Sequence, residues 1–130
     1  MKHQDLTDKL IKGCYKVYNT LGFGFLEKVY ENALFFELTK NGFDVEKQKK
    51  IEVYYFGELV GDSYADLKVN GLVILELKAH ECLLEEHESQ LINYLKATEI
   101  EVGLLLNFGK KPEIRRKVFD NDKKKTFNLE

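Results

Sequence analysis

Cysteine is scarce in this sequence: Cys14 and Cys82 are the two cysteines among 130 residues. Two cysteines so far apart do not make a disulfide framework, so we expect both to be reduced thiols in a cytosolic setting. Cys82 and His87 also lack the partners that a zinc site requires. The sequence therefore disfavours the classes of small domain that depend on disulfides or zinc.

Long apolar runs are absent as well. No stretch approaches the roughly 18 consecutive apolar residues of a membrane helix, and residues 1–5 are not followed by the apolar segment of a signal peptide. We therefore expect a soluble, cytoplasmic protein that does not contact membranes. Because the chain has 130 residues, 44% of them hydrophobic, we expect residues 1–130 to form a single domain.

An excess of charge of one sign is also missing, since 20 Lys and Arg residues face 22 Asp and Glu residues for a net charge of −2. This balance argues against a generally basic surface for nucleic acid, so any phosphate binding must come from local patches. Such patches are either ordinary solvated faces or phosphate contacts. The basic clusters are Lys47, Lys49 and Lys50, then Lys110 and Lys111, then Arg115, Arg116 and Lys117, and finally Lys123, Lys124 and Lys125.

Apolar periodicity predicts an order of two helices, three strands, a helix and a strand. A helix between two buried strands implies a parallel crossover, so we expect a mixed sheet with helices packed on it. After Lys110 the chain is basic, contains the single proline, and is expected to end in a short helix or strand and a loose tail. The predicted helices cover about 5–20, 26–38 and 85–98, and the predicted strands about 43–56, 59–68, 72–79 and 102–108.

The predicted strands carry charges that need a function, because Asp66 and the sequence Glu76-Leu77-Lys78 interrupt apolar segments. Burying such charges costs several kcal/mol each, at order of magnitude, unless they are paired or bind a metal. A two-residue loop at Asn70-Gly71 would place Asp66 and Glu76 on opposite faces. A three-residue loop over 69–71, with Gly71 left-handed, would place Asp66 opposite Ile74 and on the face of Glu76 and Lys78.

In the second register Asp66 and Glu76 are diagonal neighbours, about 7–8 Å apart at the backbone. Two carboxylates at that separation suit one hard cation between them, and magnesium or manganese is the expected cofactor. Lys78 would then lie beside the metal, where it can orient a water or neutralise a phosphate.

Two predicted helices carry further candidate residues. Glu27 lies in the first turn of its helix, with Tyr30 on the same face, so this pair either points into a cleft or is an ordinary charge at a helix start. His87, Gln90 and Tyr94 form one helical stripe beside the apolar one. That stripe is either a solvated face or a polar edge that overlooks Glu76.

At these positions the chain resembles the PD-(D/E)XK nuclease superfamily, whose core is a restriction-endonuclease-like αβββαβ arrangement. The signature of its GxxExxY family is matched by residues 24–30, and residues 90–94 resemble the QxxxY helix motif of nuclease domains in bacterial recombination helicases. Ala65 replaces the proline that precedes the first aspartate in the superfamily pattern. The resemblance implies an α/β fold, of the α+β kind with a mixed sheet, that carries an extra N-terminal helix.

The resemblance also implies roles for individual residues. Asp66 and Glu76 would ligate magnesium or manganese, with the Leu77 carbonyl as a further ligand and Lys78 positioning the attacking water. Glu27 would contribute to the metal site directly or through water. Two more residues, Gln90 and Tyr94, would hold the site or the scissile strand.

From the residues and the resemblance together we expect a metal-dependent nuclease, a hydrolase that cleaves DNA phosphodiester bonds. The first alternative is a non-catalytic module of nuclease fold that binds nucleic acid or a protein partner. A second is a phosphodiesterase for another substrate, or an accessory subunit. A homodimer or a complex with a protein partner is compatible with each of these.

Overall fold

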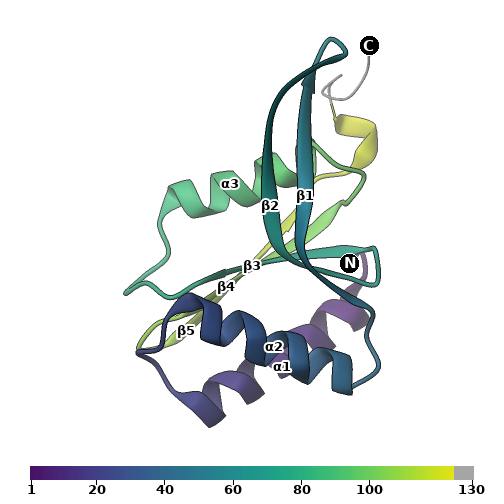
Figure 1. Ribbon diagram of the computed structural model, residues 1–130. Coiled ribbons are helices and arrows are strands. Elements are labelled where there is room, and N and C mark those ends of the chain that lie inside the picture. Colours follow the sequence, from purple (N-terminus) through teal and green to yellow (C-terminus); the bar gives the residue numbers. More distant parts are fainter. Residues whose placement is uncertain (125–130) are drawn as a thin grey trace.

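The computed structural model describes residues 1–124 as three α-helices, five β-strands and a short 3-10 helix (Figure 1). The predicted order of the elements is confirmed, and the short element expected after Lys110 is a fifth strand. The expected loose tail lies outside the described residues. In chain order the elements are α1 (Gln4–Leu21), α2 (Glu27–Lys40), β1 (Val45–Tyr55), β2 (Glu58–Val69), β3 (Val73–Lys78), α3 (Glu85–Lys96), β4 (Val102–Phe108), β5 (Pro112–Val118) and the 3-10 helix Asn121–Lys123.

The five strands form one mixed sheet in the order β1-β2-β3-β4-β5. β3 and β4 are parallel, whereas the other neighbouring strands are antiparallel. The connection between the two parallel strands passes through α3, as the sequence predicts. Helices α1 and α2 lie on one face of the sheet and α3 lies on the other (Figure 1).

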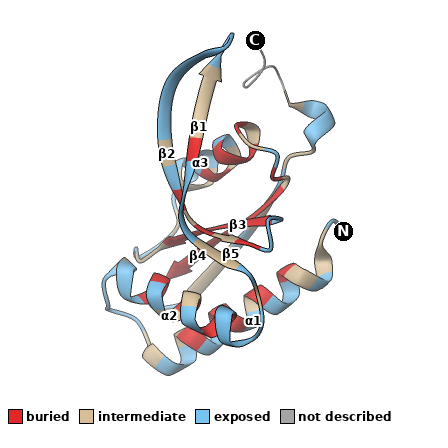
Figure 2. Ribbon diagram, turned by 45° about the vertical axis from the view of Figure 1, so that its right-hand side comes forward, coloured by how far each residue is buried: buried red, intermediate tan, exposed pale blue. Residues whose placement is uncertain are grey.

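Each face of the sheet has its own apolar core. Leu10, Leu34 and Leu38 of α1 and α2 pack on one face, and Leu91 and Leu95 of α3 pack on the other. All seven residues of β4 are buried because this strand is covered on both sides. Figure 2 shows the buried residues concentrated in the middle strands and on the inward faces of the helices.

β1 and β2 form a long hairpin whose outer part extends beyond the sheet (Figures 1 and 2). Leu67 of β2 belongs to the core under α1 and α2, whereas Ala65 belongs to the core under α3. Two residues at that spacing would share one face of a regular strand. The hairpin therefore twists between them, and Asp66 lies in the twist.

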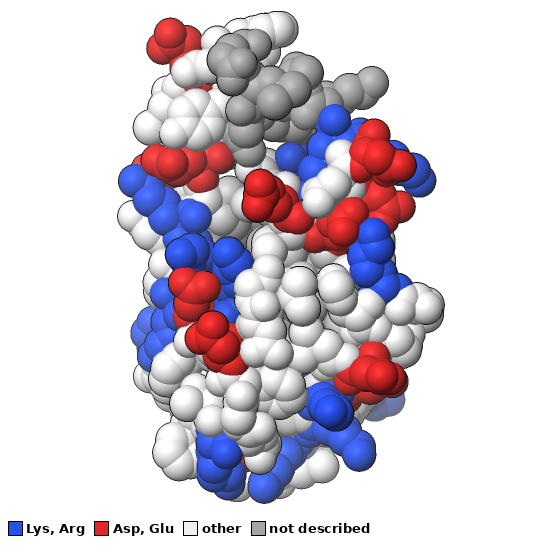
Figure 3. All heavy atoms as spheres, turned by 90° about the vertical axis from the view of Figure 1, so that its right-hand side faces the viewer, with Lys and Arg blue, Asp and Glu red and all other residues white. Residues whose placement is uncertain are grey.

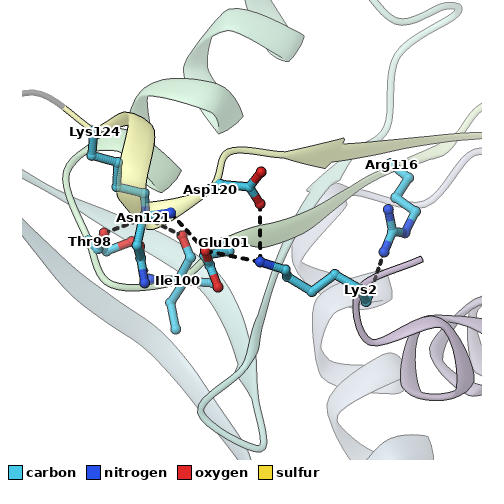
Figure 4. Close-up of polar contacts among 8 residues, drawn as sticks. All are labelled: Lys2, Thr98, Ile100, Glu101, Arg116, Asp120, Asn121 and Lys124. Carbon is cyan, nitrogen blue, oxygen red and sulfur yellow. Dashed lines mark hydrogen bonds and ion pairs between the residues drawn. The ribbon is translucent and has the colours of Figure 1, made fainter.

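The last described residues are fixed beside the start of α1 (Figure 4). The Lys2 ammonium group lies 3.1 Å from carboxylate oxygens of both Glu101 and Asp120. Lys124 donates to two carbonyl oxygens of the loop after α3, at 2.8 Å each. These contacts hold the 3-10 helix against the end of α3. None of the helices in the described residues is long and apolar enough to cross a membrane.

Candidate active site

The site begins where β2 and β3 separate. Leu67 pairs with Leu75, and the same register continued by one step brings Asp66 directly opposite Glu76. At this step the backbone pairing of β2 with β3 ends, and carboxylate side chains accept the hydrogen bonds of the backbone N–H groups. The backbone N–H of Asp66 donates to Glu76 Oε1 at 2.9 Å, and the N–H of Leu77 donates to Asp66 Oδ2 at 2.8 Å. The predicted convergence of Asp66 and Glu76 on one face is thereby confirmed.

The predicted register is wrong in detail. Asp66 is not opposite Ile74, because Ile74 pairs with Lys68 and the loop between paired residues covers 70–72 instead of 69–71. The N–H of Leu72 donates to the Val69 carbonyl, which closes a two-residue turn, but Leu72 is then left out of the strand pairing. Because Leu72 is unpaired, three residues still separate the paired strands, and Asp66 and Glu76 lie on the same face, as the predicted loop also required. The left-handed Gly71 is confirmed, with φ of 67°.

Burial makes the two carboxylates difficult to ionise together. Glu76 is 4% exposed, and burial raises the pKa of Glu76 from 4.5 to about 8, with the charge of Asp66 as the next contribution. Burial also raises the pKa of Asp66, while the Leu77 N–H bond lowers it. The protein alone thus disfavours ionisation of both carboxylates at once, and a bound cation would favour their charged forms.

Lys78 supplies one positive charge close to this pair. It is half-buried at the end of β3, and its charge lowers the pKa values of both Asp66 and Glu76. Lys78 Nζ also donates to Gln90 Oε1 of α3 at 3.4 Å. The structure therefore brings Asp66, Glu76, Lys78 and Gln90 together from two strands and one helix.

Tyr94 reaches the same region from the next turn of α3. Its side chain is 8% exposed, and its hydroxyl group lies 2.7 Å from Ser63 Oγ of β2. Burial raises the pKa of Tyr94, and the charges of Glu76 and Asp66 also contribute to that rise. Tyr94 thus links β2 to α3, close enough to the carboxylates for their charges to affect its pKa.

Helix α2 directs two carboxylates toward the site. The charge of Glu27, its first residue, contributes to the raised pKa values of both Asp66 and Glu76. The sequence analysis missed Glu31, which is 4% exposed and whose charge also contributes to the raised pKa of Asp66. The four-residue spacing from Glu27, which puts both on one helical face, is the signal that could have identified it.

Tyr30 does not point into the site. Its hydroxyl group donates to the Gly22 carbonyl at 2.6 Å and accepts from the Phe25 N–H at 3.3 Å. Its ring is fully buried and stacks on Phe108, with ring centroids 4.4 Å apart. Tyr30 therefore braces the loop before α2, and through that loop the start of the helix where Glu27 lies.

Asp66 and Glu76 are suited to one hard cation that takes only a few of its ligands from the protein. In the described part of the chain no group of three His, Cys, Asp or Glu side chains is arranged to hold a metal ion. Asp66 and Glu76 nevertheless offer two converging carboxylates with raised pKa values. Magnesium is commonly held by one or two carboxylates and keeps several waters, so two such ligands match its preference.

A cavity of about 760 Å³ is lined by Ala65, which precedes Asp66 in β2, and by Ile74, which lies two residues before Glu76 in β3, but neither carboxylate lines it. Five lysines from β1, β2, α3 and the residue after the 3-10 helix also line it: Lys49, Lys50, Lys68, Lys96 and Lys124. Figure 3 shows basic and acidic side chains lying next to one another on one face of the molecule, with no large patch of either sign. Positive charge is thus local, as the small net charge requires.

The fold is that of a nuclease-like α+β domain, and the sequence comparison agrees. Residues 4–117 match the family model of the PD-(D/E)XK nuclease superfamily, so the chain belongs to this superfamily. Its members generally use divalent metals. None of the curated proteins matches the sequence.

A solved structure, the crystal structure of SSO0001, has the same fold. The alignment has a TM-score of 0.57 and 18% sequence identity, and it covers 92% of this chain and 60% of that one. The chain thus spans about 60% of the length of this relative. At such low identity the likeness supports the fold alone.

Proposed function

We propose that this protein is a divalent-metal-dependent nuclease that hydrolyses phosphodiester bonds of DNA. The observation that carries the proposal is the convergence of Asp66 and Glu76 at the split between β2 and β3, with the Lys78 ammonium group beside them. Residues 24–30 further support a place in the GxxExxY family of the superfamily.

Asp66 and Glu76 would hold magnesium or manganese, with the Leu77 carbonyl as a further ligand. When bound, the metal would supply an activated water and stabilise charge on the phosphate. The Lys78 ammonium group would donate a hydrogen bond to the attacking water or to a phosphate oxygen. Glu27 would hold a metal-bound water from α2, and Gln90 would keep Lys78 in place.

Tyr94 and the lysines would serve the substrate. The Tyr94 hydroxyl group would hold the hairpin, through Ser63, at a fixed distance from α3. Of the five lysines that line the neighbouring cavity, Lys68 and Lys96 would contact the DNA backbone. Lys124 already donates to two carbonyl oxygens, and Lys49 and Lys50 are paired with carboxylates. Because the chain has no overall positive charge, such a local group is the feature that best supports DNA as the substrate.

Cleavage assays with single-stranded, duplex and branched DNA, each with Mg²⁺ and with Mn²⁺, test the proposal. Replacing Glu76 or Lys78 by alanine should each lower the cleavage rate by roughly a hundredfold or more, as for groups that act on developing charge. Because such groups act as one unit, the double variant should be hardly slower than either single one. Lys12→Ala, on an exposed position of α1, is the matched control and should cleave normally.

A non-catalytic module that binds nucleic acid or a protein partner is the alternative. It is favoured by the absence of a third metal-binding side chain from the described residues and by the raised pKa of Glu76. No cleavage of any of the DNA forms, or equal cleavage by wild type and Glu76→Ala, would overturn the nuclease proposal, and binding of DNA without cleavage would support this alternative.

A further inference from the structure

Gln48 has an unusual backbone conformation at the point where β1 faces Asp66. Lys47 pairs with Leu67 and Lys49 pairs with Ala65, so Gln48 and Asp66 form the one gap in this stretch of the ladder. The φ of Gln48 is 49°, in the left-handed region that non-glycine residues rarely adopt. Such conformations persist only where surrounding contacts impose them.

The side chain of Gln48 supplies those contacts. Its Nε2 atom donates to Glu31 Oε1 at 3.0 Å and to Asp66 Oδ1 at 3.5 Å. The other oxygen of Glu31 accepts from Lys28 Nζ at 3.0 Å. A chain of polar contacts therefore runs from α2 through the Gln48 amide to the first carboxylate of the site.

We propose that Gln48 is a positioning residue that holds the Asp66 carboxylate in the orientation needed for metal binding. This inference rests on the proposed metal site. The Leu77 N–H holds Asp66 Oδ2 and the Gln48 amide holds Oδ1, so the plane of the carboxylate is fixed from both sides. The same amide places a neutral donor between Asp66 and the buried Glu31, two groups of like charge.

Two variants separate this role from a purely structural one. Gln48→Gly and Gln48→Ala both lose the amide, but glycine also relieves the left-handed backbone whereas alanine does not. Calorimetric titration of the metal-free protein with Mn²⁺ should show both variants binding about 10–100-fold more weakly than wild type, as for loss of a group that orients a metal ligand. The thermal midpoint of the glycine variant should equal or exceed that of wild type.

Phe56→Gly is the matched control. Phe56 is a non-glycine residue with the same φ of 49°, but it lies in the turn of the hairpin. This variant should gain stability in the same way and keep wild-type affinity for Mn²⁺. If Gln48 acts only through its backbone, the Mn²⁺ affinity of the variants will rise and fall with their thermal stability. Gln48→Gly would then bind Mn²⁺ as tightly as wild type, and that result would overturn the inference.

The inference and the proposed function fail in different ways. If wild type binds Mn²⁺, Gln48→Gly binds it weakly, and neither cleaves DNA, the positioning role stands and the nuclease activity is wrong. If wild type cleaves DNA and Gln48→Gly keeps its affinity for Mn²⁺, the activity stands and the positioning role is wrong. A wild-type protein that takes up no Mn²⁺ overturns both.

Discussion

Glu76 keeps one hydrogen bond from the Asp66 N–H, yet it lies 4% exposed beside another carboxylate. Burial and the Asp66 charge raise its pKa to about 8. At the residue scale this acid opposes folding whenever it is ionised without a cation, because desolvation and repulsion disfavour its charged form. Residues of a functional site often have such a cost.

Ionisation of Glu76 should lower the free energy of unfolding of the metal-free protein. Because the pKa of Glu76 is raised from 4.5 to about 8, its stabilising contribution is fully present below about pH 4.5 and is lost as pH rises through about 8. Glu76→Gln cannot ionise, and its amide can donate to Asp66. We expect this variant to be more stable than wild type by about 1–3 kcal/mol at pH 8, since one pKa unit is worth about 1.4 kcal/mol.

Urea unfolding of both proteins in the presence of a chelator checks this prediction. The difference between them should shrink toward pH 4.5, where wild-type Glu76 is protonated as well. Glu58→Gln, at an exposed position of β2, is the control and should show no such trend. A Glu76→Gln variant less stable than wild type at pH 8 would contradict the raised pKa.

At the scale of elements, apolar periodicity predicted the order of the helices and strands, which the structure confirms. The strands that carry Asp66 and Glu76 were also predicted to pair, because a carboxylate in an apolar segment requires a polar partner or a cation. The pairing of β2 with β3 was harder to predict, because Asn70-Gly71 forms a two-residue turn while Leu72 drops out of the ladder. In the observed register Val69 pairs with Val73, and both lie in the core under α1 and α2.

Gln48 could not be assigned to the site from the sequence for a related reason, and for Glu31 the sequence offers only its four-residue spacing from Glu27. Gln48 lies in a run of charged residues that reads as an ordinary strand edge, and its left-handed backbone arises only once the hairpin twists at Asp66. Glu31 becomes informative when α2 docks on the sheet and buries it. Both depend on contacts between elements that lie far apart in the sequence.

The close packing of α3 on the sheet gives an element-scale prediction. A Cβ atom on Gly103 of β4 would lie 2.7 Å from Leu91 Cδ1 and 3.2 Å from its Cγ atom. Leu91 is fully buried, so Gly103→Ala should displace α3 and destabilise the protein by about 1–3 kcal/mol, as for other overpacked cores. Gly61→Ala, where a Cβ meets nothing within 4 Å, should be close to neutral in the same denaturation experiment.

At the scale of the whole molecule, a net charge of −2 leaves DNA binding to local groups such as the lysines around the cavity. Each phosphate contact contributes about 0.7–0.9 to the slope of log affinity against log salt concentration. Replacing both Lys68 and Lys96 by glutamine should therefore lower this slope by about 1.4–1.8. Fluorescence anisotropy without divalent metal measures it, and Lys9→Gln with Lys12→Gln on α1 should leave it unchanged.

The central claim is that Asp66 and Glu76 form one divalent-metal site, and a calorimetric titration with Mn²⁺ tests it most directly. Because burial raises the pKa of Glu76, binding near pH 7 should release a proton, and the affinity should increase as pH rises toward about 8. Titration in two buffers of different ionisation enthalpy detects that proton. The account predicts one site that is lost in Glu76→Gln and in Asp66→Ala. Undiminished Mn²⁺ binding by both variants, or none by wild type, would contradict it.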